Sequence, residues 1–330
     1  MDGISDPVDQ ALLDDWQRDF PIVPRPFDVL AGALGIPASQ VVAKLRQFCA
    51  TGRVTRVGAT CAPNTVSAST LAAIAAPETR IEEVARIIER FPGVNHSYLR
   101  EDDWNLWFVV TGPDRAHVDA TLAGIEAASG LRVLDLRLVR PFNVDLGFAL
   151  RGEALPPPVA RRVDCAAFED ADRPILQALT NGLPLSERPY ADLAADLGLG
   201  EDHLIGRIRA LVAARIISRL GVIVRHRALG WRANAMVVWD MPHEAITHAG
   251  PLLAAHPGIT LCYERRPVAG IWPYRLYSMI HARSRAEALD VLDRVCALPE
   301  FRNTPHKPLF SIRCFKQMGA LVAAPERTVA

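Results

Sequence analysis

Apolar and polar residues alternate over the first part of the chain with the periodicity of amphipathic helices. Apolar side chains recur at three- and four-residue spacing over 12–34 and again over 37–48, and Gly52 follows at a position where helices commonly end. The segment 53–58 mixes arginine and threonine with valine, which is typical of an extended strand. We therefore interpret residues 1–60 as a winged helix-turn-helix in which this strand is the wing.

The pattern changes after this module, and strands then alternate with helices. Strands are expected near 69–75, 94–100, 104–111 and 132–140, and helices near 81–90 and 115–127. The resulting order, strand-helix-strand-strand-helix-strand, is that of a ferredoxin-like domain.

The whole pattern occurs twice in the chain. A constant separation relates equivalent residues of the two helical modules, and a slightly larger one relates those of the strand-rich parts. The matching pairs include Pro21 with Pro184, Pro26 with Pro189, Gly35 with Gly198, Gly58 with Gly221, Gly93 with Gly258, and Arg100 with Arg265.

The repeat predicts an α+β fold made by tandem duplication of a winged helix-turn-helix followed by a ferredoxin-like domain. In the second unit, strands are expected near 233–239, 259–264, 275–281 and 307–315, with helices near 246–255 and 285–296. The predicted boundaries are 1–60 and 61–150 for unit one, 151–170 for a proline-containing linker, and 171–224 and 225–330 for unit two.

Composition narrows the functional class. The chain has 330 residues with 37 basic and 37 acidic side chains, so it lacks the basic excess that phosphate-backbone binding usually requires. Its six cysteines include no C-x-x-C pair, which argues against a zinc site or a disulfide framework. With no apparent signal peptide or membrane-length apolar run, we expect a cytoplasmic protein without a bound metal of its own.

A Tyr-x-Arg motif ends one predicted strand in each unit. Unit one has Tyr98 and Arg100, preceded by His96, and unit two has Tyr263 and Arg265. Residues two apart on a strand point to the same face, so each motif presents a phenol and a guanidinium together. The aromatic residues that follow are Trp104 in unit one and Trp272 and Tyr274 in unit two.

Several further segments, in a fixed order, connect these motifs to a known family. The chain resembles the Lrp/AsnC regulators and, within that superfamily, the siroheme decarboxylases in which two Nir-type subunits are fused. The segments that carry the resemblance are 56–59, 63–65, 68–73, 96–101 and 105–108 in unit one, and 225–227, 233–239, 262–265, 272–274 and 279–281 in unit two.

The resemblance implies a reaction in haem d1 biosynthesis. Two acetate side chains of siroheme would lose carbon dioxide to give didecarboxysiroheme, with no cofactor beyond the iron of the substrate. Arginines would bind the substrate carboxylates, aromatic rings and Tyr98 would line the macrocycle, and histidine would protonate the carbanion or ligate the iron. The arginines are Arg100, Arg225, Arg227, Arg265 and Arg275, and the rings are Trp104, Tyr263, Trp272 and Tyr274.

The two units differ in their histidines. Unit one has His96 where unit two has Leu261, whereas unit two has His226 where unit one has Pro63. This complementarity predicts one composite catalytic site, with His96 from one unit and His226 from the other. We assign His281 to the sheet, with a position facing the substrate as the alternative. The expected partner is siroheme, with further Nir-type subunits or self-association left open.

Two other functions remain open at this point. A winged helix is typical of a DNA-binding regulator, although fold alone does not settle function. One of the two expected recognition helices opens with Glu201 and Asp202, which would face phosphates unfavourably. A tetrapyrrole sensor that binds its ligand without turnover is the second alternative.

Overall fold

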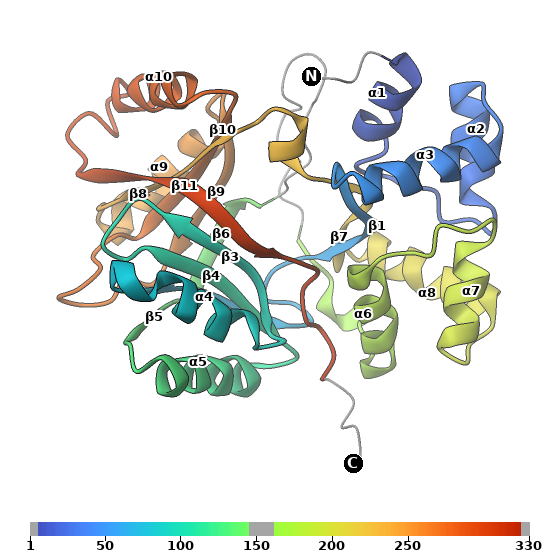
Figure 1. The fold of residues 1–330 in the computed structure, drawn as a ribbon, viewed down its shortest axis with the longest axis horizontal. Helices are drawn as coiled ribbons and strands as arrows, with labels where there is room; N and C mark the ends of the chain where they lie inside the picture. Colours follow the sequence, from blue (N-terminus) through green and yellow to red (C-terminus); the bar gives the residue numbers. More distant parts are fainter. Residues whose placement is uncertain (1–5, 145–161, 325–330) are drawn as a thin grey trace.

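A computed structural model describes residues 6–144 and 162–324. Figure 1 shows a helical body on one side and a larger body of strands and helices on the other. The strands β1 (Val54–Cys61) and β7 (Ile217–Val224) lie between them. Most of the predicted linker 151–170 lies outside the described residues.

Both units contribute helices to the helical body. Their apolar faces form a single shared core, in which Leu45 of unit one and Ile208 of unit two are fully buried. The helices are α1 (Pro7–Asp14), α2 (Pro26–Leu34) and α3 (Ala38–Ala50) from unit one, and α6 (Arg173–Asn181), α7 (Pro189–Asp196) and α8 (Glu201–Ala213) from unit two.

The strands predicted as wings pair with each other. β1 runs antiparallel to β7, with Gly58 opposite Gly221. A Cβ atom on Gly221 would lie 2.3 Å from the carbonyl oxygen of Gln17, so only glycine allows the unit-one chain to cross β7 there. The strand in each unit is where the sequence predicts it, and it pairs with the equivalent strand of the other unit. One edge of each strand is thereby satisfied by the other unit.

Each unit contains the expected ferredoxin-like order of elements, which confirms the predicted α+β duplication. Unit one contributes β2 (Ala68–Ile74), α4 (Ile81–Glu89), β3 (Val94–Arg100), β4 (Leu106–Gly112), α5 (Arg115–Ser129) and β5 (Val133–Leu136). Unit two contributes β8 (Ala233–Trp239), α9 (His243–Ala255), β9 (Ile259–Arg265), β10 (Leu276–Ala282), α10 (Arg285–Cys296) and β11 (His306–Gln317).

The last strand of each unit continues into the sheet of the other. The predicted strand 132–140 is divided into β5, which pairs with β2, and β6 (Leu138–Asn143), which pairs with β9 of unit two. The long strand β11 pairs first with β8 of its own unit and then with β3 of unit one. The resulting strand order is β5-β2-β4-β3-β11-β8-β10-β9-β6, so the two units form one continuous sheet.

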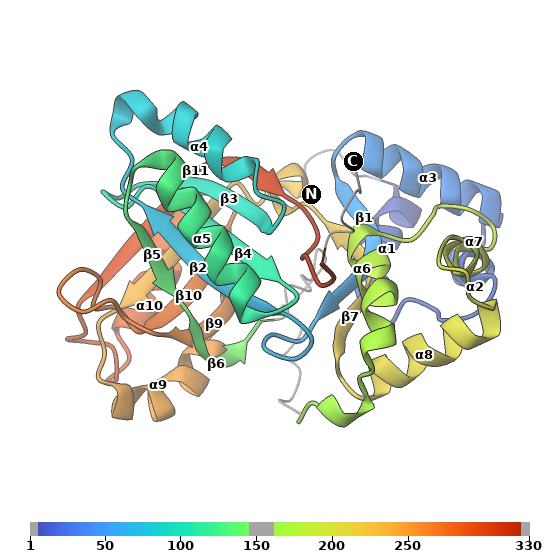
Figure 2. The ribbon, with the colours of Figure 1, turned by 90° about the horizontal axis from the view of Figure 1, so that it is seen from below.

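The interior lies between the two halves of this sheet. Figure 2 shows α4 and α5 on one side of the strands and α9 on the other. Side chains from both units form one apolar cluster in the interior, where the Trp107 and Trp272 rings lie 5.3 Å apart. The β3–β11 pairing that joins the halves positions the candidate site described below.

A search of the described residues for membrane spans finds no single helix that is long and apolar enough. Only the pair α2 and α3, bent by 98°, meets the length and composition requirement together. Within the same residues, no group of three or more histidine, cysteine or acidic side chains could hold a metal ion.

Candidate active site

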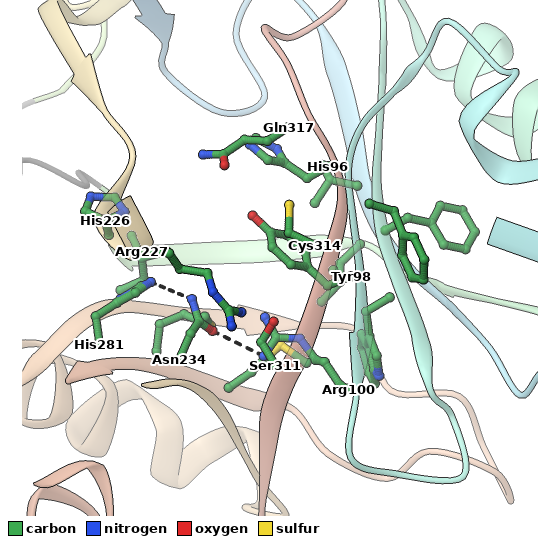
Figure 3. A pocket seen from close by; sticks show the side chains of 18 of the residues that line it. His96, Tyr98, Arg100, His226, Arg227, Asn234, His281, Ser311, Cys314 and Gln317 are labelled. Carbon is green, nitrogen blue, oxygen red and sulfur yellow. Dashed lines mark hydrogen bonds between the residues drawn. The ribbon is translucent and has the colours of Figure 1, made fainter. Parts of the chain in front are cut away.

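A cavity of about 350 Å³ lies in the interior, next to the junction of β3 with β11. This volume falls within the range of small-molecule sites. Side chains of both units form its wall, as Figure 3 shows. Its apolar lining includes Leu71, Trp107, Met236, Leu261 and Met279.

His96, Tyr98 and Arg100 follow one another along β3 and all line the cavity. The β3–β11 register places Gln317 opposite His96 and Cys314 opposite Tyr98. The rings of His96 and Tyr98 are stacked, with centroids 6.4 Å apart. The sequence therefore places an imidazole, a phenol and a guanidinium on one wall of one cavity.

His226 reaches the same cavity from the other unit. It follows β7 and begins the short 3-10 helix His226–Leu229, which ends at Gly230 with a φ of 97°. The cavity lining therefore joins His226 from the connection of unit two with His96 from the sheet of unit one. The structure brings the two predicted histidines together.

Burial keeps these histidines neutral. Loss of water contact, together with a smaller effect of the Arg56 charge, lowers the pKa of His96 to about 4. The pKa of His226 is lowered well below its ordinary value by burial, by His281 and by Arg219. Since neutral imidazole is the form that accepts protons or binds metal, the cavity wall holds two bases.

Arg100 is a buried cation whose described hydrogen bonds go to uncharged oxygens. Its side chain is 5% exposed, and Nη1 donates to the Leu309 carbonyl at 2.9 Å and to Asn234 Oδ1 at 3.3 Å. Its Nε has no hydrogen-bond partner within the described part of the chain, and burial lowers the pKa of the guanidinium. A buried charge of this kind is costly until an anion compensates it, so the cavity wall favours a carboxylate.

Arg225 and Arg227 flank His226 and are exposed, while also lining the cavity. Tyr263 lines the cavity too, and its ring stacks on that of Tyr277 with centroids 5.7 Å apart. Together with Arg100, the two exposed arginines give the cavity three cations on its lining.

Five residues predicted from the sequence to bind substrate do not line the cavity. Trp272 is 2% exposed and donates to the Tyr277 hydroxyl at 2.8 Å, and Tyr274 packs against it. Arg265 is half-buried over the Tyr263 ring and donates to the Leu136 carbonyl at 2.7 Å. The five outside the lining are Trp104, Arg265, Trp272, Tyr274 and Arg275.

The cavity also contains side chains that sequence reasoning did not select. His281 was assigned to the sheet; it lies on β10 as assigned and also lines the cavity. Its position in the 279–281 segment was the only signal available, because a strand pattern does not reveal which face is open. The others are Asn234, Ser311, Cys314 and Gln317, and three of these lie on the exchanged strand β11.

Comparison with known proteins relates this architecture to a family. A profile described as "AsnC-like ligand binding domain" matches residues 66–142 and 228–316. One described as "Siroheme decarboxylase NirDL-like HTH domain" matches residues 9–54 and 172–217. The siroheme decarboxylase NirDL subunit of Paracoccus denitrificans (strain Pd 1222) is 52% identical over 96% of this chain and 98% of its own length.

Two solved structures share the fold over nearly the whole chain. The crystal structure of the siroheme decarboxylase NirDL aligns with a TM-score of 0.68 at 25% identity, covering 95% of this chain and 93% of that one. The structure of NirDL in co-complex with an iron-uroporphyrin III analogue aligns with a TM-score of 0.66 at 25% identity, covering 92% and 90%. The chain belongs to the siroheme decarboxylases of the fused NirDL type, which are carboxy-lyases.

Proposed function

We propose that the cavity beside β3 and β11 is the place where this chain converts siroheme to didecarboxysiroheme. In each half-reaction an acetate carbon–carbon bond breaks and carbon dioxide leaves. The electron pair that remains on the methylene carbon takes up one proton, and a methyl group results. Two acetates therefore require two protons and no oxidant, which is consistent with a reaction that needs no organic cofactor.

The observation that carries this proposal is the meeting of His96 and His226 in one cavity that also contains a buried cation. Neither unit alone has both imidazoles, and the cavity draws its wall from both. We assign His96 and His226 as the acid–base pair, in keeping with histidine's role in proton transfer at neutral pH.

A histidine can donate a proton only when it is protonated, and the negative charge of the substrate would favour that state. Both imidazoles are neutral, because burial lowers their pKa values. Siroheme brings several carboxylates, and negative charge close to an imidazole raises its pKa. Substrate binding would thus favour the protonated form of a histidine, which can then donate its proton to the methylene carbon. A histidine that stays neutral could instead ligate the substrate iron.

Three arginines are proposed to hold the substrate carboxylates. Arg100 would bind one carboxylate deep in the wall, where its charge lacks an acidic neighbour among its described hydrogen bonds. Arg225 and Arg227 would bind others at the exposed side of the cavity. Guanidinium suits this task because it binds carboxylate through two parallel hydrogen bonds.

The regulator alternative is weakened by contacts in the helical body. Basic side chains of the candidate recognition helices are used inside the chain. Arg46 of α3 donates to the Leu185 carbonyl and Arg209 of α8 donates to the Ile22 carbonyl, each at 2.6 Å. Lys44 is paired with Asp9 at 2.5 Å. These cations would have to leave their partners before they could contact phosphate.

Anaerobic incubation of the protein with siroheme, followed by mass analysis of the pigment, tests the proposed function. We expect the loss of two carbon dioxide units per macrocycle. Unchanged pigment with tight siroheme binding would favour the sensor, and tight DNA binding with unchanged pigment would favour the regulator. A gel-shift titration at physiological salt with mixed-sequence duplex DNA measures the last outcome.

A further inference from the structure

A chain of hydrogen bonds behind the cavity wall connects Arg100 to the sheet of unit two. Arg100 Nη1 donates to Asn234 Oδ1, and Asn234 Nδ2 lies 2.7 Å from His281 Nε2. His281 Nδ1 lies 2.7 Å from Thr260 Oγ1, which donates to the Met279 carbonyl at 3.0 Å. Figure 3 draws the contacts of Asn234 with its two neighbours.

Counting the protons gives one self-consistent direction for this chain. When the single hydroxyl proton of Thr260 is given to the Met279 carbonyl, which can only accept, Thr260 accepts a hydrogen bond from His281 Nδ1–H. Nε2 of a neutral imidazole is then an acceptor, and it receives the amide N–H of Asn234. The amide oxygen of Asn234 is thereby turned toward Arg100.

A charged His281 would break the sequence of donors and acceptors. Protonated Nε2 would face the amide N–H of Asn234, and turning the amide over would then aim its N–H at Arg100. The surroundings oppose that state, because burial and the charge of Arg100 lower the pKa of His281 to about 3. The imidazole ring of His226 lies with its centroid 5.4 Å from that of His281. Protonation of both rings would place two like charges at this distance, which is unfavourable.

We propose that His281 is a positioning residue that holds Arg100 through Asn234, ready for a substrate carboxylate, and takes no part in proton transfer. The inference rests on the carboxylate-binding role of Arg100 given above. It explains why a third histidine lines a cavity whose acid–base chemistry needs only two. It also explains how unit two orients a guanidinium that belongs to unit one, across the intervening strand β11.

The test compares two substitutions at one position. His281→Phe keeps a ring and removes both nitrogens, whereas His281→Gln supplies an amide oxygen for Asn234 and an amide N–H for Thr260. We expect His281→Phe to raise the siroheme dissociation constant about tenfold, since a charge-assisted hydrogen bond is lost from Arg100. We expect His281→Gln to restore affinity to within about threefold of the wild type, and the single-turnover rate at saturation to stay within about threefold in both.

Two further variants guard against misfolding as an explanation. Asn234→Leu should raise the dissociation constant like His281→Phe, and Thr260→Val should have a smaller effect in the same direction. Thr247→Val is the matched control, because it is the same substitution at a residue outside the cavity lining. Thr247 lies on α9 and contacts Arg140. Thermal unfolding of each protein without siroheme shows whether the fold persists.

The opposite pattern would overturn the inference. If His281→Gln is as impaired as His281→Phe, and the defect is in the single-turnover rate, His281 acts in proton transfer. A shift of the siroheme absorption bands in His281→Gln would show that it ligates the iron. Affinity is measured without turnover, so a wild type that binds siroheme but releases no carbon dioxide would sink the proposed reaction and leave this comparison intact.

Discussion

The two Tyr-x-Arg strands have different surroundings. On β3, Tyr98 and Arg100 both face a cavity together with His96. On β9, Tyr263 lines the same cavity and stacks on Tyr277, whereas Arg265 is half-buried outside the cavity lining. The motif thus lines the cavity with both of its residues in one unit and with its tyrosine alone in the other.

A difference in loop length accompanies this contrast. The hairpin between β3 and β4 spans 101–105, whereas the one between β9 and β10 spans 266–275. The longer loop carries Trp272 into the interior, where it donates to the Tyr277 hydroxyl and packs against Trp107. Duplication thus supplied two similar faces, and side-chain packing filled part of the β9 face.

Removal of His96 or His226 from the cavity lining should have the largest effect on the reaction. We expect His96→Ala and His226→Ala each to lower the decarboxylation rate by a factor on the order of 10² to 10⁴, the usual contribution of a general acid or base. Stopped-flow or quenched assays under anaerobic conditions measure the rate. Full turnover in both single variants would exclude the composite site, and His306→Ala, outside the cavity lining, is the control.

Removal of Trp272 should affect the stability of the fold rather than substrate binding. Because this ring is buried, Trp272→Ala should lower the free energy of unfolding by about 3–5 kcal/mol. Denaturant unfolding measures the loss. The siroheme affinity of the folded fraction should change little; a rise of more than about tenfold in the dissociation constant would instead make Trp272 a substrate wall, as its sequence motif suggested.

The paired arginines sharpen the contrast further. Arg100→Met should weaken siroheme binding about tenfold, the order of magnitude of one charge-assisted carboxylate contact. Arg265→Met should leave affinity within about twofold, because Arg265 does not line the cavity. Anaerobic absorbance titration of both variants gives the comparison directly. Equal losses of affinity would show that the two faces still act as one substrate surface.

Acid should lower the stability of the fold through the histidines that line the cavity. The pKa of His96 is lowered to about 4 and that of His281 to about 3, whereas an unfolded histidine titrates near 6.5. The unfolded chain therefore binds more protons as pH falls from about 6.5 toward 4, and stability is lost in that window. Melting temperatures should fall there less steeply in His96→Gln than in wild type, whereas an unchanged slope would contradict the buried-neutral state.

The sequence is enough to predict the repeat, the order of elements and part of the cavity wall. Helical and strand periodicities are local properties, so they show where an element lies. His96 and His226 were recognisable because each has a non-histidine counterpart in the other unit. Tyr98 and Arg100 followed from alternation along one strand.

The partners of the strands could not be predicted in the same way. A strand has the same alternating pattern whether it pairs within its unit or across to the other, so the exchange of β6 and β11 left no local signal. Cys314 and Gln317 enter the cavity only through that exchange. The positions of Trp272 and Arg265 depended on which face was filled, which is decided by packing between distant segments.

The exchange of β6 and β11 also changes the role of the peptide connection between the units. Two exchanged strands and one shared helical core already hold the units together. The covalent connection then acts by raising the effective concentration of one unit around the other. The chain is in this sense an intramolecular dimer, and the cavity lined by both units should survive a dilution that would separate two independent subunits.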